Sequence, residues 1–360
     1  MGTRPTIHDV AIRAKVSPAT VSRLLNGSAR VGPETEALVR QAMDELGYVP
    51  SRLAQSFARG SSRTIAVLVD GEGESLQGNA FLMTVALGLN DVLADADYSI
   101  RIINGHQAMR QSRQTASEWT RERWMRHEFD GVVITNPTTT DTLIEAIVQA
   151  EIPAVVIGRY PHAEGLIEID VDNVGGTRMA TAHLTDIGHR RIAFLGPPDR
   201  LTVASDRRQG YLEALTRSGI WPDPDWFLET EGTDLEVFSF DAAHRAVVMA
   251  AKKPWSWSAV VAFNDEMALG AVRALLESGI ELPRDVSIVG FDDLPFARMV
   301  NPSLTTVHQD IRQLGQHAGR ALLAVLRGRK VADLTIQTVS LVIRSSTAPT
   351  RDLTTVDLEP

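Results

Sequence analysis

Short apolar, β-branched runs alternate with amphipathic segments over most of this chain, from residue 64 onward. Strands that are apolar on both faces and separated by helices are typical of parallel sheets covered by helices on both sides. About 300 residues of this pattern exceed one typical core, so we predict two doubly wound lobes that bind a ligand at the carboxyl ends of their strands. The candidate strands are 64–69, 98–103, 131–135, 154–157, 192–195, 259–263 and 286–290, and the candidate helices between them include 175–184, 207–217 and 266–278.

The first 49 residues instead show three short helical segments with their own start and stop signals. Residues 6–9 (Thr-Ile-His-Asp) resemble a capping box at the start of a first helix. Ser17-Pro18 predicts an N-cap followed by proline at the first position of a second helix, residues 18–25. Gly32-Pro33 opens a third helix that ends at Gly47. This segment is therefore expected to be a small all-α unit.

A hinge follows the three helices. Residues 50–58 predict a helix of one or two turns, and 59–63 (Arg-Gly-Ser-Ser-Arg) have the composition of a flexible linker. We therefore divide the chain into a helical headpiece at 1–49, a hinge helix and linker at 50–63, and a two-lobed body at 64–360.

Charge is distributed unevenly between these parts. Residues 1–63 carry nine Lys+Arg and five Asp+Glu, a balance of +4. Of the 36 basic and 45 acidic residues in the chain, 27 and 40 remain for the body, a balance of −13 that brings the total to −9. A basic head on an acidic body predicts that only the head approaches a polyanion such as DNA.

Signatures of catalysis, secretion and membrane insertion are missing from the sequence. The chain has no cysteine, and the glycine fingerprint that begins at Gly71 has Leu76 at its last position. No phosphate-binding loop and no nucleophile elbow occur. The longest apolar runs span about six residues, and the amino terminus lacks the apolar core of a signal peptide. We therefore predict a cytoplasmic protein with no catalytic residue, metal site, cofactor or membrane partner.

The headpiece resembles the lactose/galactose repressor (LacI/GalR) family in one unbroken frame. The matching residues are Thr-Ile-His-Asp-Val-Ala at 6–11, Ala14, and Val-Ser-Pro-Ala-Thr-Val-Ser-Arg-Leu-Leu-Asn-Gly at 16–27, followed by Gly-Tyr-Val-Pro at 47–50 and Arg-Leu-Ala at 52–54. Two helices joined by a tight turn also have helix-turn-helix proportions.

The body resembles the same family over most of its length. The matching segments are 186–194, the Arg-x-x-Gly-Tyr motif at 207–211, and residues 263–270, 286–293, 304–307 and 309–310. The resemblance implies an α/β fold, in which a helix-turn-helix headpiece precedes a two-lobed, periplasmic-binding-protein-like body with parallel sheets.

The resemblance assigns DNA contacts to the second helix. It implies that Pro18, Ala19 and Arg23 approach bases, and that three hydroxyl residues, Ser17, Thr20 and Ser22, bind phosphates. Thr6 and Asn26 complete this predicted set. Arginine can make a bidentate contact to guanine, whereas hydroxyls suit phosphate oxygens. For Pro18 the alternative is that it only starts the helix.

Phe57 stands where the family's hinge helix usually presents a leucine to the minor groove. An apolar wedge partly unstacks a base step and bends the duplex, so we expect Phe57 to insert at the operator centre. The alternative is that Phe57 packs on the body or on the dimer mate.

The resemblance places the ligand between the lobes, and the implied ligand-binding residues are Arg207, Asn264, Asp292, Gln309 and Ile311. Carboxylate, amide and guanidinium groups suit the hydroxyls of a polyol. Asn264 and Asp292 have the alternative role of loop caps.

One position departs from the better-known sugar-binding members. Gly158-Arg159 stands where some relatives carry a ligand-binding aspartate, which weakens the inference to a galactoside-like ligand. A sugar or sugar derivative is expected, with a nucleobase or a phosphorylated coregulator as alternatives.

These observations predict a homodimeric transcriptional regulator, a repressor, that binds pseudo-palindromic operator DNA under the control of a small effector. A solute-binding protein or an enzyme on the same two-lobed scaffold is the alternative. The headpiece argues against the first, and the missing catalytic motifs argue against the second.

Overall fold

The computed structural model describes residues 5–26, 31–49, 61–69, 79–135, 137–138, 141–161, 164–199, 201–231, 237–251 and 256–350. The chain divides into two units, one of residues 1–64 with 122–130 and one of residues 65–121 with 131–360. The expected hinge helix at 50–58 lies outside the described residues.

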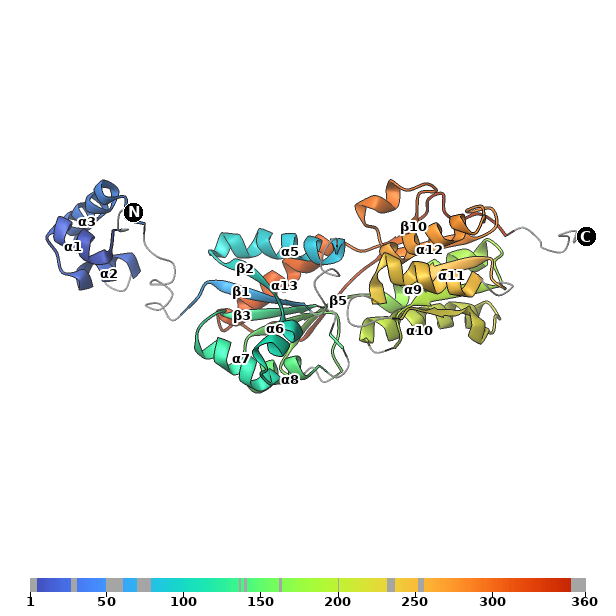
Figure 1. The fold of residues 1–360 in the computed structure, drawn as a ribbon, viewed down its shortest axis with the longest axis horizontal. Coiled ribbons are helices and arrows are strands. Elements are labelled where there is room, and N and C mark those ends of the chain that lie inside the picture. The colour runs from blue at the N-terminus through green and yellow to red at the C-terminus, as the bar shows by residue number, and fades with distance from the viewer. Residues whose placement is uncertain are drawn as a thin grey trace, which may run out of the picture. The chain divides into compact units, whose positions relative to one another are not determined.

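Three helices form the headpiece, as the sequence predicts: α1 (Ile7–Ala14), α2 (Pro18–Asn26) and α3 (Pro33–Leu46) (Figure 1). The Thr6 hydroxyl accepts a hydrogen bond from the Asp9 amide, while the Asp9 carboxylate accepts one from the Thr6 amide, which completes the expected capping box. Gly47 ends α3 with φ of +62°, a conformation that glycine adopts without strain. The buried core of the headpiece consists of Val10, Ala11, Ala14, Val21, Val39 and Ala42.

The amino-terminal lobe contains a six-stranded sheet in the order β11-β5-β4-β3-β1-β2. Its strands are β1 (Thr64–Val69), β2 (Ser99–Asn104), β3 (Gly131–Thr135), β4 (Ala154–Ile157), β5 (Ile167–Val171) and β11 (Leu334–Gln337). Neighbours from β11 to β1 run parallel, with Val67 opposite Val133 in the β1–β3 pair. Helices α5 (Ala80–Leu93) and α13 (Ile311–Leu326) lie on one face, and α6 (Gly105–Ser112) and α8 (Thr142–Gln149) lie on the other (Figure 1). Helix α7 (Ala116–Met125) precedes β3 along the chain.

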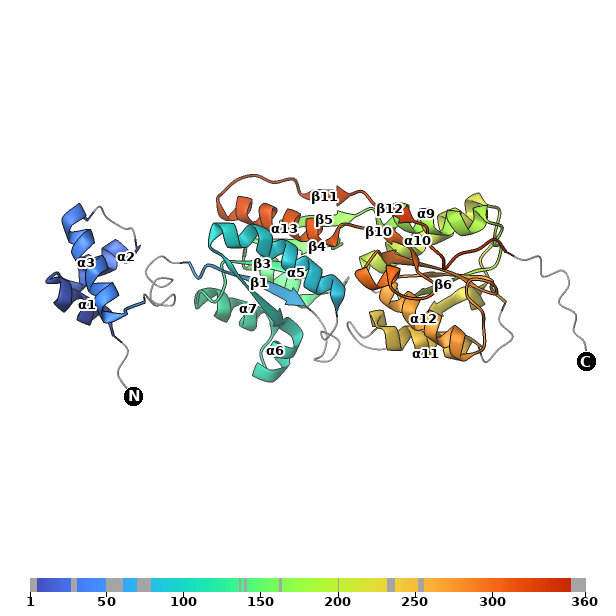
Figure 2. The same ribbon diagram turned by 90° about the horizontal axis from the view of Figure 1, so that it is seen from above.

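The carboxyl-terminal lobe repeats this plan with the strand order β12-β10-β9-β8-β6-β7. Its strands are β6 (Ile192–Gly196), β7 (Phe227–Glu229), β8 (Ala259–Ala262), β9 (Ser287–Asp292), β10 (Thr305–His308) and β12 (Ser340–Val342). All pairs are parallel except β10–β12. Helices α9 (Asn173–Asp186) and α10 (Thr202–Arg217) pack together on one face, and α11 (Phe240–Ala251) and α12 (Asp265–Glu277) pack together on the other (Figure 2). Short 3₁₀ turns lie at Ala94–Ala96, Pro224–Trp226 and Pro295–Arg298.

The chain passes between the lobes three times, after β5, after β10 and between β11 and β12. The residues at these crossings therefore lie where the two lobes meet. All seven candidate strands are confirmed within two residues at each end. The candidate strands did not include β5, β7, β10, β11 or β12. The β5 sequence alternates apolar and acidic residues, so it lacks the continuous apolar pattern of its neighbours. Among the described residues, no helix is both long and apolar enough to span a membrane.

Candidate DNA-binding face and ligand pocket

Helix α2 is capped at its amino end as the Ser17-Pro18 pair predicts. The Ser17 hydroxyl accepts a hydrogen bond from the Thr20 amide at 3.1 Å and lies 2.9 Å from the Thr20 hydroxyl. Pro18 occupies the first helical position, where the absent amide hydrogen costs no intrahelical bond. Both hydroxyl groups therefore lie at the amide-rich end of α2, where phosphate oxygens bind readily.

The two faces of α2 differ in exposure. Val21 is buried, and Leu24 and Leu25 pack against the headpiece core. Pro18 and Ala19 are exposed, as is Arg23, whereas Ser22 and Thr20 are half-buried. The apolar face fixes the rotation of the helix, so the residues predicted to approach bases lie on its outer side.

The structure describes three other predicted DNA-binding residues to different extents. Thr6 is exposed and caps α1. Asn26 is the last residue of α2, but its side chain lies outside the described residues, and Phe57 lies outside them altogether. The predicted roles of these residues stay predictions.

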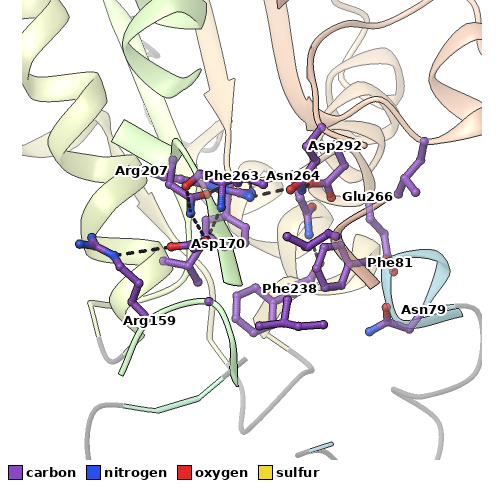
Figure 3. A pocket seen from close by; sticks show the side chains of 18 of the residues that line it. Asn79, Phe81, Arg159, Asp170, Arg207, Phe238, Phe263, Asn264, Glu266 and Asp292 are labelled. Carbon is purple, nitrogen blue, oxygen red and sulfur yellow. Dashed lines mark hydrogen bonds and ion pairs between the residues drawn. The ribbon is translucent and has the colours of Figure 1, made fainter. Parts of the chain in front are cut away.

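A pocket opens at the carboxyl ends of strands from both lobes and encloses about 940 Å³, its open mouth included (Figure 3). The amino-terminal lobe contributes residues that end or follow β4 and β5, and the carboxyl-terminal lobe contributes residues that end or follow β8, β9 and β10. Four of the five predicted ligand-binding residues line it, namely Arg207, Asn264, Asp292 and Gln309.

Arg207, on α10, is the most constrained of these side chains. It is 5% exposed and lies between two aromatic rings, with its guanidinium carbon 4.5 Å from the Phe263 ring centre and 3.6 Å from that of Phe291. Its Nε donates to Asn173 Oδ1 at 2.9 Å and its Nη1 donates to the Phe263 carbonyl at 2.5 Å. Burial lowers the pKa of Arg207, and the neighbouring carboxylates, Asp292 first, oppose this lowering. Its remaining N–H groups are donors in a fixed orientation.

Asp292 ends β9 and faces Arg207 across the pocket. Asp292 Oδ1 lies 3.7 Å from Arg207 Nη2 and accepts a hydrogen bond of 2.5 Å from Gln309 Nε2. The φ of Asp292 is +115°, which is strained for a residue with a Cβ atom. Such strain is concentrated at functional sites, and Asp292 lines the pocket.

Asn264 and Ile311 differ from the other predicted residues. Asn264 caps α12, because its Oδ1 accepts from the Met267 amide at 2.7 Å, while it also lines the pocket. The alternative capping role is therefore real and coexists with a place in the site. Ile311 is 5% exposed, is part of the hydrophobic core and is not among the lining residues. It begins α13, and the apolar face of that helix directs it to the core.

Several polar residues of the pocket were not predicted from the sequence. Asp170, at the end of β5, accepts hydrogen bonds from the Val171 amide at 2.8 Å and from Asn173 Nδ2 at 2.9 Å. Arg159 Nε lies 3.5 Å from Asp170 Oδ2, and Arg159 also forms a close ion pair with Asp206. A strand predicted at β5 would have placed Asp170 at the edge of the sheet where ligands bind. The sequence pattern did not predict β5, so it did not predict Asp170 either.

Gly158 explains how Arg159 reaches this position. Gly158 follows β4 with φ of +103°, which a residue with a side chain adopts only at a cost. The turn brings the residue that departs from the sugar-binding pattern to the edge of the pocket, where it is paired with acidic groups.

Aromatic side chains form part of the apolar lining of the pocket. Phe81, Phe238 and Phe263 line it, and the rings of Phe238 and Phe263 lie 5.2 Å apart. Phe81 comes from α5 and Phe238 from the segment before α11, so the two lobes both contribute (Figure 3). A ligand site with aromatic walls and a few fixed polar groups is typical of small-molecule recognition.

Burial gives the carboxyl groups of the site unusual proton affinity. It raises the pKa of Asp170 to about 6 and that of Asp292 to about 6, against the lowering effect of the neighbouring arginines. Asp265, fully buried beside Asp292, has its pKa raised in the same direction by burial, although it accepts hydrogen bonds from Thr306 Oγ1 at 2.5 Å and the Leu294 amide at 2.8 Å. Among the described residues, no group of three or more His, Asp and Glu side chains could hold a metal ion.

Comparison with known proteins identifies both parts of the chain. Residues 6–51 match the family described as bacterial regulatory proteins, lacI family, and residues 181–347 match the periplasmic binding protein-like domain. The HTH-type transcriptional regulator CelR of Thermobifida fusca is 32% identical over 345 residues, which are 95% of this chain and 96% of that protein.

Two solved structures extend the similarity to the fold. The CelR–cellobiose complex has a TM-score of 0.70 at 30% identity and covers 95% of this chain and 100% of its own. The lac repressor dimer bound to operator and the anti-inducer ONPF has a TM-score of 0.78 at 28% identity and covers 96% of this chain and 100% of its own.

Identity above 30% across nearly the whole length of both proteins includes the headpiece as well as the body. The predicted fold class, a helix-turn-helix headpiece on a periplasmic-binding-protein-like body, is confirmed with it. The chain belongs to the LacI family of bacterial regulatory proteins, and it is a DNA-binding transcriptional regulator under the control of a small ligand.

Proposed function

We propose that this protein is a repressor whose effector is an uncharged sugar or sugar derivative bound by Arg207, Asp292, Asn264 and Gln309, with Asp170 as a further partner. The observation that carries the proposal is the pocket itself, whose lining sets guanidinium, carboxyl and amide groups beside aromatic rings. Vicinal hydroxyls can donate to the carboxylates and accept from the guanidinium. The CelR structure contains cellobiose in the corresponding family fold, which supports the same ligand class here.

Charge in the pocket disfavours an anionic effector. Among the described lining residues, Asp170, Glu266 and Asp292 carry carboxyl groups, while Arg159 and Arg207 carry guanidinium groups. Both arginines already contact carboxylates of the protein. A phosphate would therefore lose its hydration without gaining an unopposed cation. A phosphorylated coregulator is the weaker alternative for this reason.

The DNA partner is a pseudo-palindromic operator read by a homodimer. The lac repressor relative is a dimer on operator DNA, and two-fold symmetric proteins bind two-fold symmetric sites. In this proposal Arg23 reads a guanine in each half-site, Pro18 and Ala19 make apolar contacts with bases, and the hydroxyls of Ser17, Thr20 and Ser22 bind phosphates. Thr6 and Asn26 add contacts at the ends of α1 and α2, and Phe57 inserts at the centre.

The proposal also covers the absence of enzymatic activity, the location of the protein and the division of the chain. The relatives are transcriptional regulators, so we assign no catalytic activity and no cofactor, and we place the protein in the cytoplasm with the chromosome. Ile311 acts in this proposal through the core, at the start of α13 after the crossing that carries Gln309. The division into a headpiece at 1–49, a hinge at 50–63 and a body at 64–360 is retained.

The experiment is a thermal-shift screen of the full-length protein with cellobiose, D-ribose, ribose 5-phosphate and adenosine. A ligand that binds only the folded state raises the melting temperature by mass action. Stabilisation by a neutral sugar, together with a change in affinity for operator selected from random duplex DNA, supports the proposal. Stabilisation by ribose 5-phosphate alone would contradict the uncharged effector, and a shift with adenosine alone would favour a nucleobase ligand.

A further inference from the structure

The Asp130 carboxylate accepts hydrogen bonds from residues 61–63, at the end of the linker. Its Oδ1 accepts from the Ser62 amide at 2.7 Å and from the Ser62 hydroxyl at 2.8 Å. Its Oδ2 accepts from the Arg63 amide at 3.0 Å and, at short range, from the Ser61 hydroxyl. Four donors from three successive residues therefore surround one side chain that lies more than sixty residues further along the chain.

The backbone of the linker is shaped to fit this carboxylate. Arg63 has φ of +51°, so the amides of Ser62 and Arg63 turn toward the same side. Successive amides in such a conformation form a concave site for an anion. The Ser62 hydroxyl also accepts from the Thr64 amide at 3.2 Å, which closes the turn. A left-handed conformation at a non-glycine residue has a cost, and the carboxylate offsets it.

A backbone hydrogen bond also connects the starts of β1 and β3, the strands that follow Arg63 and Asp130 along the chain. The Asp130 amide donates to the Thr64 carbonyl at 2.8 Å, and Thr64 and Gly131 are the first residues of β1 and β3. These strands are parallel neighbours in the sheet. At the other end of β3, two residues beyond Thr135, Pro137 lines the ligand pocket. One strand thus leads from Asp130 to the pocket.

We propose that Asp130 is a positioning residue for DNA binding. Its carboxylate fixes residues 61–63 at the amino ends of β1 and β3, and so determines where the chain leaves the body toward the headpiece. Operator affinity then depends on Asp130, although its carboxylate contacts the linker and not DNA. This inference rests on operator binding by the wild-type protein, and its first readout needs no DNA.

The test compares wild type with Asp130→Asn in the full-length protein. An asparagine has one acceptor oxygen and directs N–H groups at the other linker donors. Hydrogen exchange of the Ser62 and Arg63 amides should accelerate, and operator affinity should fall by about tenfold, because charge-assisted bonds are lost and a donor is left unpaired. Removal of a negative charge by itself strengthens attraction to DNA, so the expected loss runs against the electrostatic effect.

Two further variants keep the outcome interpretable. Asp223→Asn is the matched control, because the exposed Asp223 carboxylate also accepts a backbone amide, that of Asp225 at 2.9 Å, but lies outside the linker contact. It should leave the exchange of the Ser62 and Arg63 amides unchanged and should not lower operator affinity, because it removes the same charge without touching the linker. The double variant Ser61→Ala with Ser62→Ala removes two hydroxyl donors and keeps the backbone pair, so it should weaken operator binding by roughly twofold to threefold. If Asp130→Asn does not fold, this double variant tests the inference in its place, and operator affinity equal to that of wild type would contradict it.

Either of two results would overturn the inference. One is unchanged exchange at Ser62 and Arg63 in Asp130→Asn, since the contact would then not hold the linker. The other is faster exchange with operator affinity equal to that of wild type, since the contact would then be structural only. A wild-type protein that selects no operator would instead contradict the proposed regulator, while the exchange measurement would still report on Asp130.

Discussion

The headpiece presents its predicted DNA-binding side chains outward, whereas the body encloses its predicted ligand-binding side chains. Arg23 is exposed on α2, and Val21 on the same helix is buried in the small headpiece core. Arg207 and Asp292 are each 5% exposed and lie in a network of hydrogen bonds and ring contacts. A recognition face can therefore change with little effect on folding, whereas a pocket residue contributes to both binding and stability.

The largest effect is expected for Arg207→Ala. It leaves Asp292 buried beside the space of its former partner, and removal of one member of a buried ion pair costs about 3–5 kcal/mol of stability. Effector binding should be lost in the same variant, as measured by calorimetry, together with a lower melting temperature. The control is Arg208→Ala, since Arg208 is the next residue on α10 but stacks on Phe227 and pairs with Asp199. A variant with normal stability and normal effector binding would show that Arg207 is not central to the pocket.

Arg23→Ala should give a smaller and more selective effect. Loss of a bidentate contact costs about 1–3 kcal/mol of operator affinity and relaxes the preference for one guanine per half-site. The melting temperature should hardly change, because the side chain is exposed. Arg40→Ala is a fitting control, because exposed Arg40 pairs with Glu36 on α3. Unaltered base preference in Arg23→Ala, measured on a set of operator variants, would remove Arg23 from base recognition.

The pocket should also respond to pH through its buried carboxyl groups. Asp170 and Asp292 have folded pKa values of about 6, above their unfolded values. The folded protein therefore holds these protons more tightly, and this contribution to stability is present below about pH 4 and lost as pH rises to about 6. Ligand hydroxyls donate best to ionised carboxylates, so effector affinity should rise from pH 5 to pH 7, by about tenfold per carboxyl group.

Asp170→Asn separates the two carboxyl groups in this measurement. It should flatten part of the pH dependence of effector affinity, while Asp292 continues to titrate with its neighbour Asp265. Calorimetry at pH 5, 6 and 7 gives the readout. An affinity that falls toward pH 7 would mean that the effector binds the protonated carboxyl groups.

Local sequence signals predicted the headpiece helices and several strands of the body. Thr6, Ser17-Pro18 and Gly47 are local signals, because caps and stops depend on residues only a few positions away, and the three headpiece helices follow from them. Apolar runs located β1, β3 and β4 in the same way. The resemblance to a known family supplied Arg207, Asn264, Asp292 and Gln309.

The rest of the site depends on contacts between distant segments. Asp170 meets Arg159 and Asn173 only when β4 and β5 pair and the chain crosses to the other lobe. Ile311 is adjacent in sequence to a pocket segment, but helical rotation turns it into the core. The wedge role of Phe57 stays a prediction, since Phe57 lies outside the described residues.

The smallest effect is expected for Thr6→Ala, which tests the headpiece from the stability side. Thr6 caps α1 through the Asp9 amide, and its own amide donates to Asp9 Oδ2 at 2.7 Å. Loss of such a cap costs about 1 kcal/mol. The same hydroxyl is predicted to contact DNA. Operator affinity should therefore fall slightly even at a temperature where the variant is fully folded. Thr6→Ser keeps the hydroxyl and should restore both, whereas Asp9→Asn should lower stability without weakening operator binding, since it also removes a negative charge. Equal operator affinity in Thr6→Ala and wild type, at a temperature where both are folded, would limit Thr6 to capping.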